Sequence, residues 1–186
     1  MKMKICVVAC ALLMAWGLKR HYADARADDL GWILSPTAGL VGVMTGESFT
    51  LQSGEGYFSR DRLFLIEKSC AGINFMIAAF GMLICALLHR VASGMSGTRV
   101  LSVSLLASYS AAVLVNAVRI TIAMWLAAHP VALPAFSAAG VHRVEGITVY
   151  FGGLVLLYEL AQRLDRRVVP VGRGLGAEAR RAEAAP

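Results

Sequence analysis

The feature that most constrains this chain is the stretch from Val100 to Val118, nineteen residues without a charged side chain. At about 1.5 Å of rise per residue, such a helix nearly matches the roughly 30 Å hydrocarbon core of a bilayer. After Arg119 the apolar pattern resumes and runs to Ala128, before His129 and Pro130. The stretch therefore predicts a helix that crosses a membrane and emerges from it.

The composition agrees with a membrane location. Apolar residues make up 58% of the 186 residues and charged residues 16%, whereas soluble domains carry about 25% charged residues. The mean hydropathy is +0.64. These values exclude a free soluble enzyme, an extended disordered chain and a collagen-like fibre. The formal net charge of +6 reflects arginines near the C-terminus, and we interpret it as a membrane-orientation signal rather than a nucleic-acid-binding surface.

The apolar pattern predicts spans near residues 5–20, 30–46, 70–89, 100–128 and 143–162, within one membrane unit over 1–162. The first run is only about 14 residues long, so it is either a helix whose flanking lysines snorkel or the core of a signal peptide. The second contains Pro36, and it can be a tilted span, a kinked helix or a re-entrant segment. Residues 163–186 are predicted to form a disordered, basic cytoplasmic tail.

Residues 47–62 are polar, and the turn-like sequence at 53–56 lies between two short apolar segments. This pattern predicts a small hairpin outside the hydrocarbon region. The predicted fold class is thus an all-α integral membrane protein, a polytopic bundle of four to five transmembrane helices with a small external hairpin-like segment.

Orientation follows from the basic residues near the helix ends. The tail and the loop from His89 to Arg99 are both basic, which predicts that both are cytoplasmic. Alternation of the spans then places Cys70, Arg119 and His142 together at the external leaflet. At the N-terminus, lysines before and basic residues after the first apolar run compete for the inner side.

Cys70 lies where a polar segment turns into an apolar helix. Ser69 is a candidate N-cap, which would place Cys70 in the first helical turn, where unpaired amides favour the nucleophilic thiolate. Lys68 adds positive charge. Alternatively, Cys70 is a small hydrophobic residue, as we assume for the remaining cysteines, whose spacing does not indicate a disulfide framework: Cys6, Cys10 and Cys85.

Arg119 is costly in the middle of a membrane, although snorkelling at a helix end explains it equally well. Asn116 precedes it by three residues on the same helical face, which predicts an interior polar site. The guanidinium could hold a substrate carboxylate or carbonyl, or stabilise a thiolate or an oxyanion.

His142 precedes the last predicted span and is the histidine placed to face Cys70. A cysteine nucleophile needs a partner that exchanges protons near neutral pH, although an interfacial histidine without catalytic function is the alternative. Motifs of serine, aspartyl and zinc proteases and of ATPases are missing from the sequence. Metal binding by Cys70 and His142 would lack a clustered third ligand, so no metal or other cofactor is expected.

The sequence resembles the exosortase/archaeosortase family in the order and context of three motifs. These are Cys70 in Ser-Cys-Ala-Gly-Ile, Arg119 in Asn-Ala-Val-Arg-Ile, and His142 followed by Gly146. The compact size and the sequence from Glu67 to Asn74 look most like the exosortase K type. The chain departs from the family in having Ala71 where many members carry serine, and in being shorter than the usual eight-span members.

The resemblance implies a polytopic inner-membrane cysteine protease, with possible transpeptidase activity, that cuts C-terminal sorting signals from exported proteins. Cys70 would be the nucleophile, with Arg119 and His142 completing a site on the periplasmic side of a bacterial membrane and Asn116 supporting it. The expected partners are the lipid bilayer and exported substrates whose C-terminal tail carries a transmembrane helix and a basic end. The alternative is a non-enzymatic membrane assembly or transport subunit.

Overall fold

The protein is mostly helical, and the computed structural model describes residues 1–61, 63–129 and 138–168. The α-helices are α1 (Lys2–Asp24), α2 (Gly31–Thr45), α3 (Ile73–Leu87), α4 (Gly94–Ala128) and α5 (Ala138–Val168). Short 3-10 turns are η1 (Asp28–Leu30), η2 (Lys68–Cys70) and η3 (Leu88–Arg90). The strands are β1 (Thr50–Gln52), β2 (Gly56–Ser59) and β3 (Phe64–Ile66).

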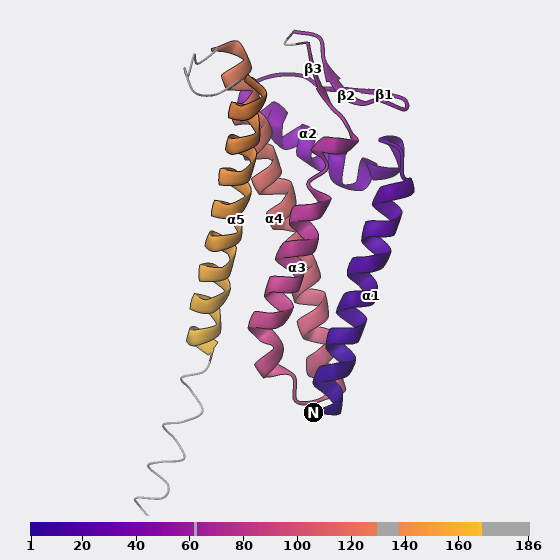
Figure 1. Ribbon diagram of the computed structural model, residues 1–186, viewed down its shortest axis with the longest axis vertical. Helices are drawn as coiled ribbons and strands as arrows, with labels where there is room; N and C mark the ends of the chain where they lie inside the picture. Colours follow the sequence, from indigo (N-terminus) through magenta and orange to yellow (C-terminus); the bar gives the residue numbers. More distant parts are fainter. Residues whose placement is uncertain (62, 130–137, 169–186) are drawn as a thin grey trace, which may run out of the picture.

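Four helices, α1, α3, α4 and α5, form an elongated bundle (Figure 1). The N-terminus and the connection between α3 and α4 lie at one end, and the sheet lies at the other. The N-terminal lysines therefore share one end of the bundle with the basic loop from His89 to Arg99.

Three helices in the described part of the chain are long and apolar enough to cross a membrane, over Lys68–Arg90, Gly94–Ala128 and Arg143–Arg166. The sequence predicts four to five spans, and the criterion of length and composition supports three of them. The helix over the first predicted span, α1, has a short apolar run between lysines, and α2 has 15 residues, about 22 Å at 1.5 Å per residue. Three such helices are compatible with a membrane protein.

Pro36 lies inside α2 without ending it. Proline has no N–H, so the carbonyl of Trp32 loses its partner within the helix. The Tyr109 hydroxyl of α4 donates to that carbonyl at 2.8 Å, and the two aromatic rings stack with centroids 5.9 Å apart. A side chain of α4 thus replaces the hydrogen bond that the proline removes.

The polar segment after α2 forms a three-stranded antiparallel sheet in the order β1-β2-β3. The sequence predicts a hairpin between the apolar segments before and after the turn. Instead, β2 lies between them, because the chain reverses at 53–55 and again before β3. Asp28 fixes the first turn, since its carboxylate accepts hydrogen bonds from the Gly54 amide at 2.9 Å and the Ser53 hydroxyl at 3.1 Å.

Small residues line the buried face of α4, which lets neighbouring helices approach closely. The clearest case is Gly97, where an added Cβ would lie 2.9 Å from Val7 of α1. Small buried residues recur along this face at Ser104, Ser108, Ala112 and Ala117.

The helix α5 lies at one edge of the bundle (Figure 1), and little of its apolar segment is buried. Its exposed apolar residues are Val144, Ile147, Phe151, Val155, Leu156, Leu160 and Leu164. At its far end Asp165 pairs with Arg90 and with His89, the latter at 3.2 Å. The helix continues to Val168, so the first residues of the predicted tail at 163–186 are helical, and 169–186 lie outside the described residues.

Candidate functional site

Cys70 lies at the end of the 3-10 turn η2 and not in the first turn of α3, which corrects the expected position. The reason is Gly72, whose φ of +68° separates the turn from the helix, a conformation that glycine adopts without strain. Ser69 does not cap α3, since its hydroxyl donates to the Glu67 carboxylate at 2.6 Å. The same hydroxyl lies 3.9 Å from the sulfur of the half-buried Cys70. The hydroxyl near the thiol thus comes from the residue before Cys70, whereas Ala71 follows it.

Lys68 binds the C-terminal end of α1. Its ammonium donates to the carbonyls of Ala23 and Ala25 at 3.0 and 2.8 Å and lies 5.1 Å from the centre of the Tyr22 ring. Carbonyls at a helix C-terminus attract cations, which explains this contact. The charge that was expected to favour the Cys70 thiolate therefore also joins η2 to α1.

Asn116 connects α4 to η2. It is only 1% exposed, and its side-chain amide donates a hydrogen bond to the backbone carbonyl of Cys70. A Cβ on Gly72 would lie 3.2 Å from the Asn116 side chain, so the absence of a side chain at 72 leaves room for this contact. The amide thus holds the backbone of the candidate nucleophile.

Arg119 points toward α5. Its Nη1 donates to the Tyr150 hydroxyl at 3.2 Å, and its guanidinium carbon lies 5.2 Å from the centre of the Tyr150 ring. Its Nε is buried without a hydrogen-bond partner among the described residues and lies 3.0 Å from where a Cβ on Gly146 would be. As their spacing predicts, Asn116 and Arg119 contact the same neighbour, because the Tyr150 hydroxyl donates to Asn116 at 2.9 Å.

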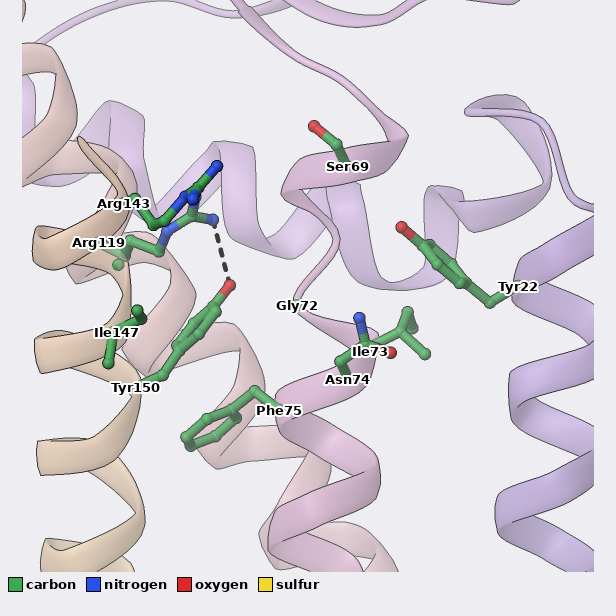
Figure 2. A pocket seen from close by; sticks show the side chains of 11 residues that line it. Tyr22, Ser69, Gly72, Ile73, Asn74, Phe75, Arg119, Arg143, Ile147 and Tyr150 are labelled. Atoms are coloured by element: carbon green, nitrogen blue, oxygen red, sulfur yellow. Dashed lines mark hydrogen bonds between the residues drawn. The ribbon is translucent and has the colours of Figure 1, made fainter. Parts of the chain in front are cut away.

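These groups border a cavity of about 470 Å³ between η2, the start of α3, α4 and α5 (Figure 2). Arg119, Arg143 and Tyr150 lie on the α5 side, and Tyr22 and Asn74 lie across from them. The lining residues include Ser69 and Gly72, which flank Cys70, but the Cys70 side chain packs against the main core. The cavity offers guanidinium, phenol, hydroxyl and amide groups, a set suited to binding carbonyl or carboxylate oxygens.

His142 lies in α5, four residues before Gly146, and its side chain is outside the described part of the structure. The described contacts include no hydrogen bond between the Cys70 thiol and Arg119. Among the described residues there is also no group of three or more His, Cys, Asp or Glu that could hold a metal ion.

Tyr150, Arg143, Tyr22 and Asn74 were not among the residues expected at the site. Tyr150 carries the one usable signal, because a tyrosine within an apolar span needs a hydrogen-bond partner. It follows Gly146 by one helical turn, whereas Tyr22 reaches the cavity only through the packing of α1.

Comparisons of the chain with protein-family models, with curated proteins and with solved structures found no match. The resemblance to exosortases therefore depends on the three sequence motifs alone.

Proposed function

We propose that this chain is a membrane-embedded cysteine peptidase of exosortase type, able to act as a transpeptidase. It would cleave C-terminal sorting signals of exported proteins at the external face of a bacterial inner membrane. The observation that supports this most is the hydrogen bond from Asn116 to the carbonyl of Cys70 beside a polar cavity, with Arg119 one turn further along α4.

In this mechanism the Cys70 thiolate attacks the scissile carbonyl carbon, and Arg119 stabilises the oxyanion that forms. The C–N bond breaks, and the leaving amine takes the proton that His142 received from the thiol. The acyl group on Cys70 then passes to water in hydrolysis or to an acceptor amine in transpeptidation. Asn116 keeps the nucleophile's backbone in place throughout.

The substrate tail would lie in the same bilayer, with its basic end in the cytoplasm and its cleavage site at the external leaflet. We include α1 as a fourth span of the enzyme, because its 23 residues run beside α3 and cover about 34 Å at 1.5 Å per residue. Its terminal lysines can snorkel to the interface. The helix α2 would then enter the membrane only in part.

The direct test is co-expression with exported proteins that end in a transmembrane helix and a basic tail. We expect a decrease in substrate size with the wild-type chain and with Cys85→Ala, and no decrease with Cys70→Ala at equal membrane levels. Cys85 is the matched control because it is an exposed free cysteine of α3 outside the cavity. Equal behaviour of the two variants would favour the non-enzymatic assembly subunit.

A further inference from the structure

Tyr150 joins three elements that the proposed mechanism needs to keep in register. It belongs to α5, its hydroxyl contacts Asn116 and Arg119 of α4, and Asn116 in turn contacts the carbonyl of Cys70 in η2. Its ring packs against Phe75 of α3 with centroids 5.3 Å apart. Thus one half-buried side chain connects α5 to the backbone of the candidate nucleophile.

The direction of each hydrogen bond in this chain is fixed by chemistry. A guanidinium can only donate and a backbone carbonyl can only accept, so Arg119 donates to Tyr150 and Asn116 must present its NH₂ to Cys70. The Asn116 oxygen therefore faces Tyr150 and accepts the phenolic proton. Every link runs the same way, from Arg119 to the Cys70 carbonyl, and hydrogen bonds in such a series strengthen one another.

Among the described residues, no other group makes the hydrogen bonds that the Tyr150 hydroxyl makes to Asn116 and Arg119. Without it, the Asn116 oxygen and Arg119 Nη1 would each lose the partner described here, and Arg119 Nε already has no described partner. The amide of Asn116 would then be held by only one of its two hydrogen bonds, the one from its NH₂ group to the Cys70 carbonyl. Arg119 and Asn116 would therefore both be held less firmly in the proposed site.

We infer that Tyr150 is a positioning residue of the site, whose hydroxyl holds Asn116 and Arg119 so that the Cys70 turn stays fixed. This inference rests on the proposed function for its effect on catalysis. The coupling between Tyr150 and Cys70 can be measured without any substrate.

The test compares Tyr150→Phe with Tyr158→Phe, which removes the hydroxyl of another tyrosine on the same helix, bonded to Gln162 outside the cavity. With a processed substrate, we expect Tyr150→Phe to lower kcat by about tenfold to a hundredfold, because small misplacements of reacting groups have such effects. We expect KM to stay within about twofold, as for an interaction that matters mainly in the transition state. Tyr158→Phe should leave both values unchanged.

The second measurement is the rate at which N-ethylmaleimide alkylates Cys70 in chains whose other cysteines are replaced by serine. Tyr150→Phe should increase this rate, because the half-buried thiol becomes accessible when its turn loosens, while kcat falls. General inactivation would also lower kcat, so a fall in kcat alone does not identify a positioning residue. The substrate test therefore adds Asn116→Ala, and the double variant Tyr150→Phe/Asn116→Ala should lose no more kcat than Asn116→Ala alone.

An alkylation rate identical to that of Tyr158→Phe would overturn the inference, as would a change confined to KM. If the wild-type chain processes no substrate, the proposed function fails while the alkylation rates still decide whether Tyr150 controls the Cys70 turn.

Discussion

At the scale of single residues, Arg119 is the side chain whose two explanations differ most. A snorkelling arginine needs only its charge and length, whereas in the structure the Arg119 guanidinium donates to Tyr150 and lies over its ring. Lysine preserves charge but not the planar, multi-donor geometry. The neighbours of Arg119 therefore favour a structural requirement for guanidinium.

We expect Arg119→Lys to lower the processing rate by on the order of a hundredfold at matched membrane levels. The control is Arg99→Lys, an exposed residue near the opposite end of α4. Arg90 is unsuitable as a control because it pairs with Asp165. A wild-type rate for Arg119→Lys would remove Arg119 from the site.

Gly146 shows how a missing side chain can matter. An alanine Cβ there would approach Arg119 Nε to 3.0 Å, whereas a Cβ on Gly152 of the same helix would meet nothing within 4 Å. Overpacking typically costs about 1–3 kcal/mol. We expect Gly146→Ala to reduce processing about tenfold or more, because a displaced Arg119 guanidinium would be misplaced in the proposed site. Gly152→Ala, measured in the same assay, should process at the wild-type rate, and equal rates for both would contradict this account.

At the scale of elements, α2 depends on α4 for an intact backbone. Tyr109→Phe leaves the Trp32 carbonyl without the hydroxyl that replaces the proline's missing N–H. We expect the free energy of unfolding in detergent to fall by about 1 kcal/mol.

Adding Pro36→Ala should recover part of that loss, because alanine supplies an N–H for the helical bond to Trp32. Denaturant titration of the two single variants and the double variant provides the comparison. Strictly additive losses would show that Tyr109 does not replace the proline's hydrogen bond.

At the scale of the whole molecule, the two ends of the bundle carry different elements and different charges. The N-terminus and the loop between α3 and α4 lie at one end, and η2 and the sheet lie at the other (Figure 1). Cys70 precedes α3 and Cys85 is near its end, about 22 Å apart at 1.5 Å per residue if measured along a helix axis. The two thiols therefore report on opposite sides of a membrane if α3 crosses it.

We expect a membrane-impermeant maleimide added to intact cells to label Cys70 in preference to Cys85, using variants in which Cys70 or Cys85 is the only cysteine left. The basic loop from His89 to Arg99 predicts a cytoplasmic location for the Cys85 end. If Cys70 is labelled only after the inner face is exposed, the predicted orientation is wrong and the site lies on the cytoplasmic side.

Much of this protein can be predicted from local pattern. The apolar runs from Ala71 and Val100 predict their helices because burial in lipid depends on composition and length alone. The spacing of Asn116 and Arg119 predicts their common face, since helical periodicity fixes which side chains are neighbours.

The sequence by itself therefore determined the apolar helices, the polar face of α4 and the position of Cys70 at the boundary of an apolar segment. Only the tertiary structure decided that Gly72 separates Cys70 from α3, that Lys68 holds the end of α1, and that Tyr150 links Arg119 to Asn116. Helix periodicity and hydropathy act over neighbouring residues, whereas the contacts of Lys68 and Tyr150 join residues 31 to 45 positions apart and depend on how the helices pack.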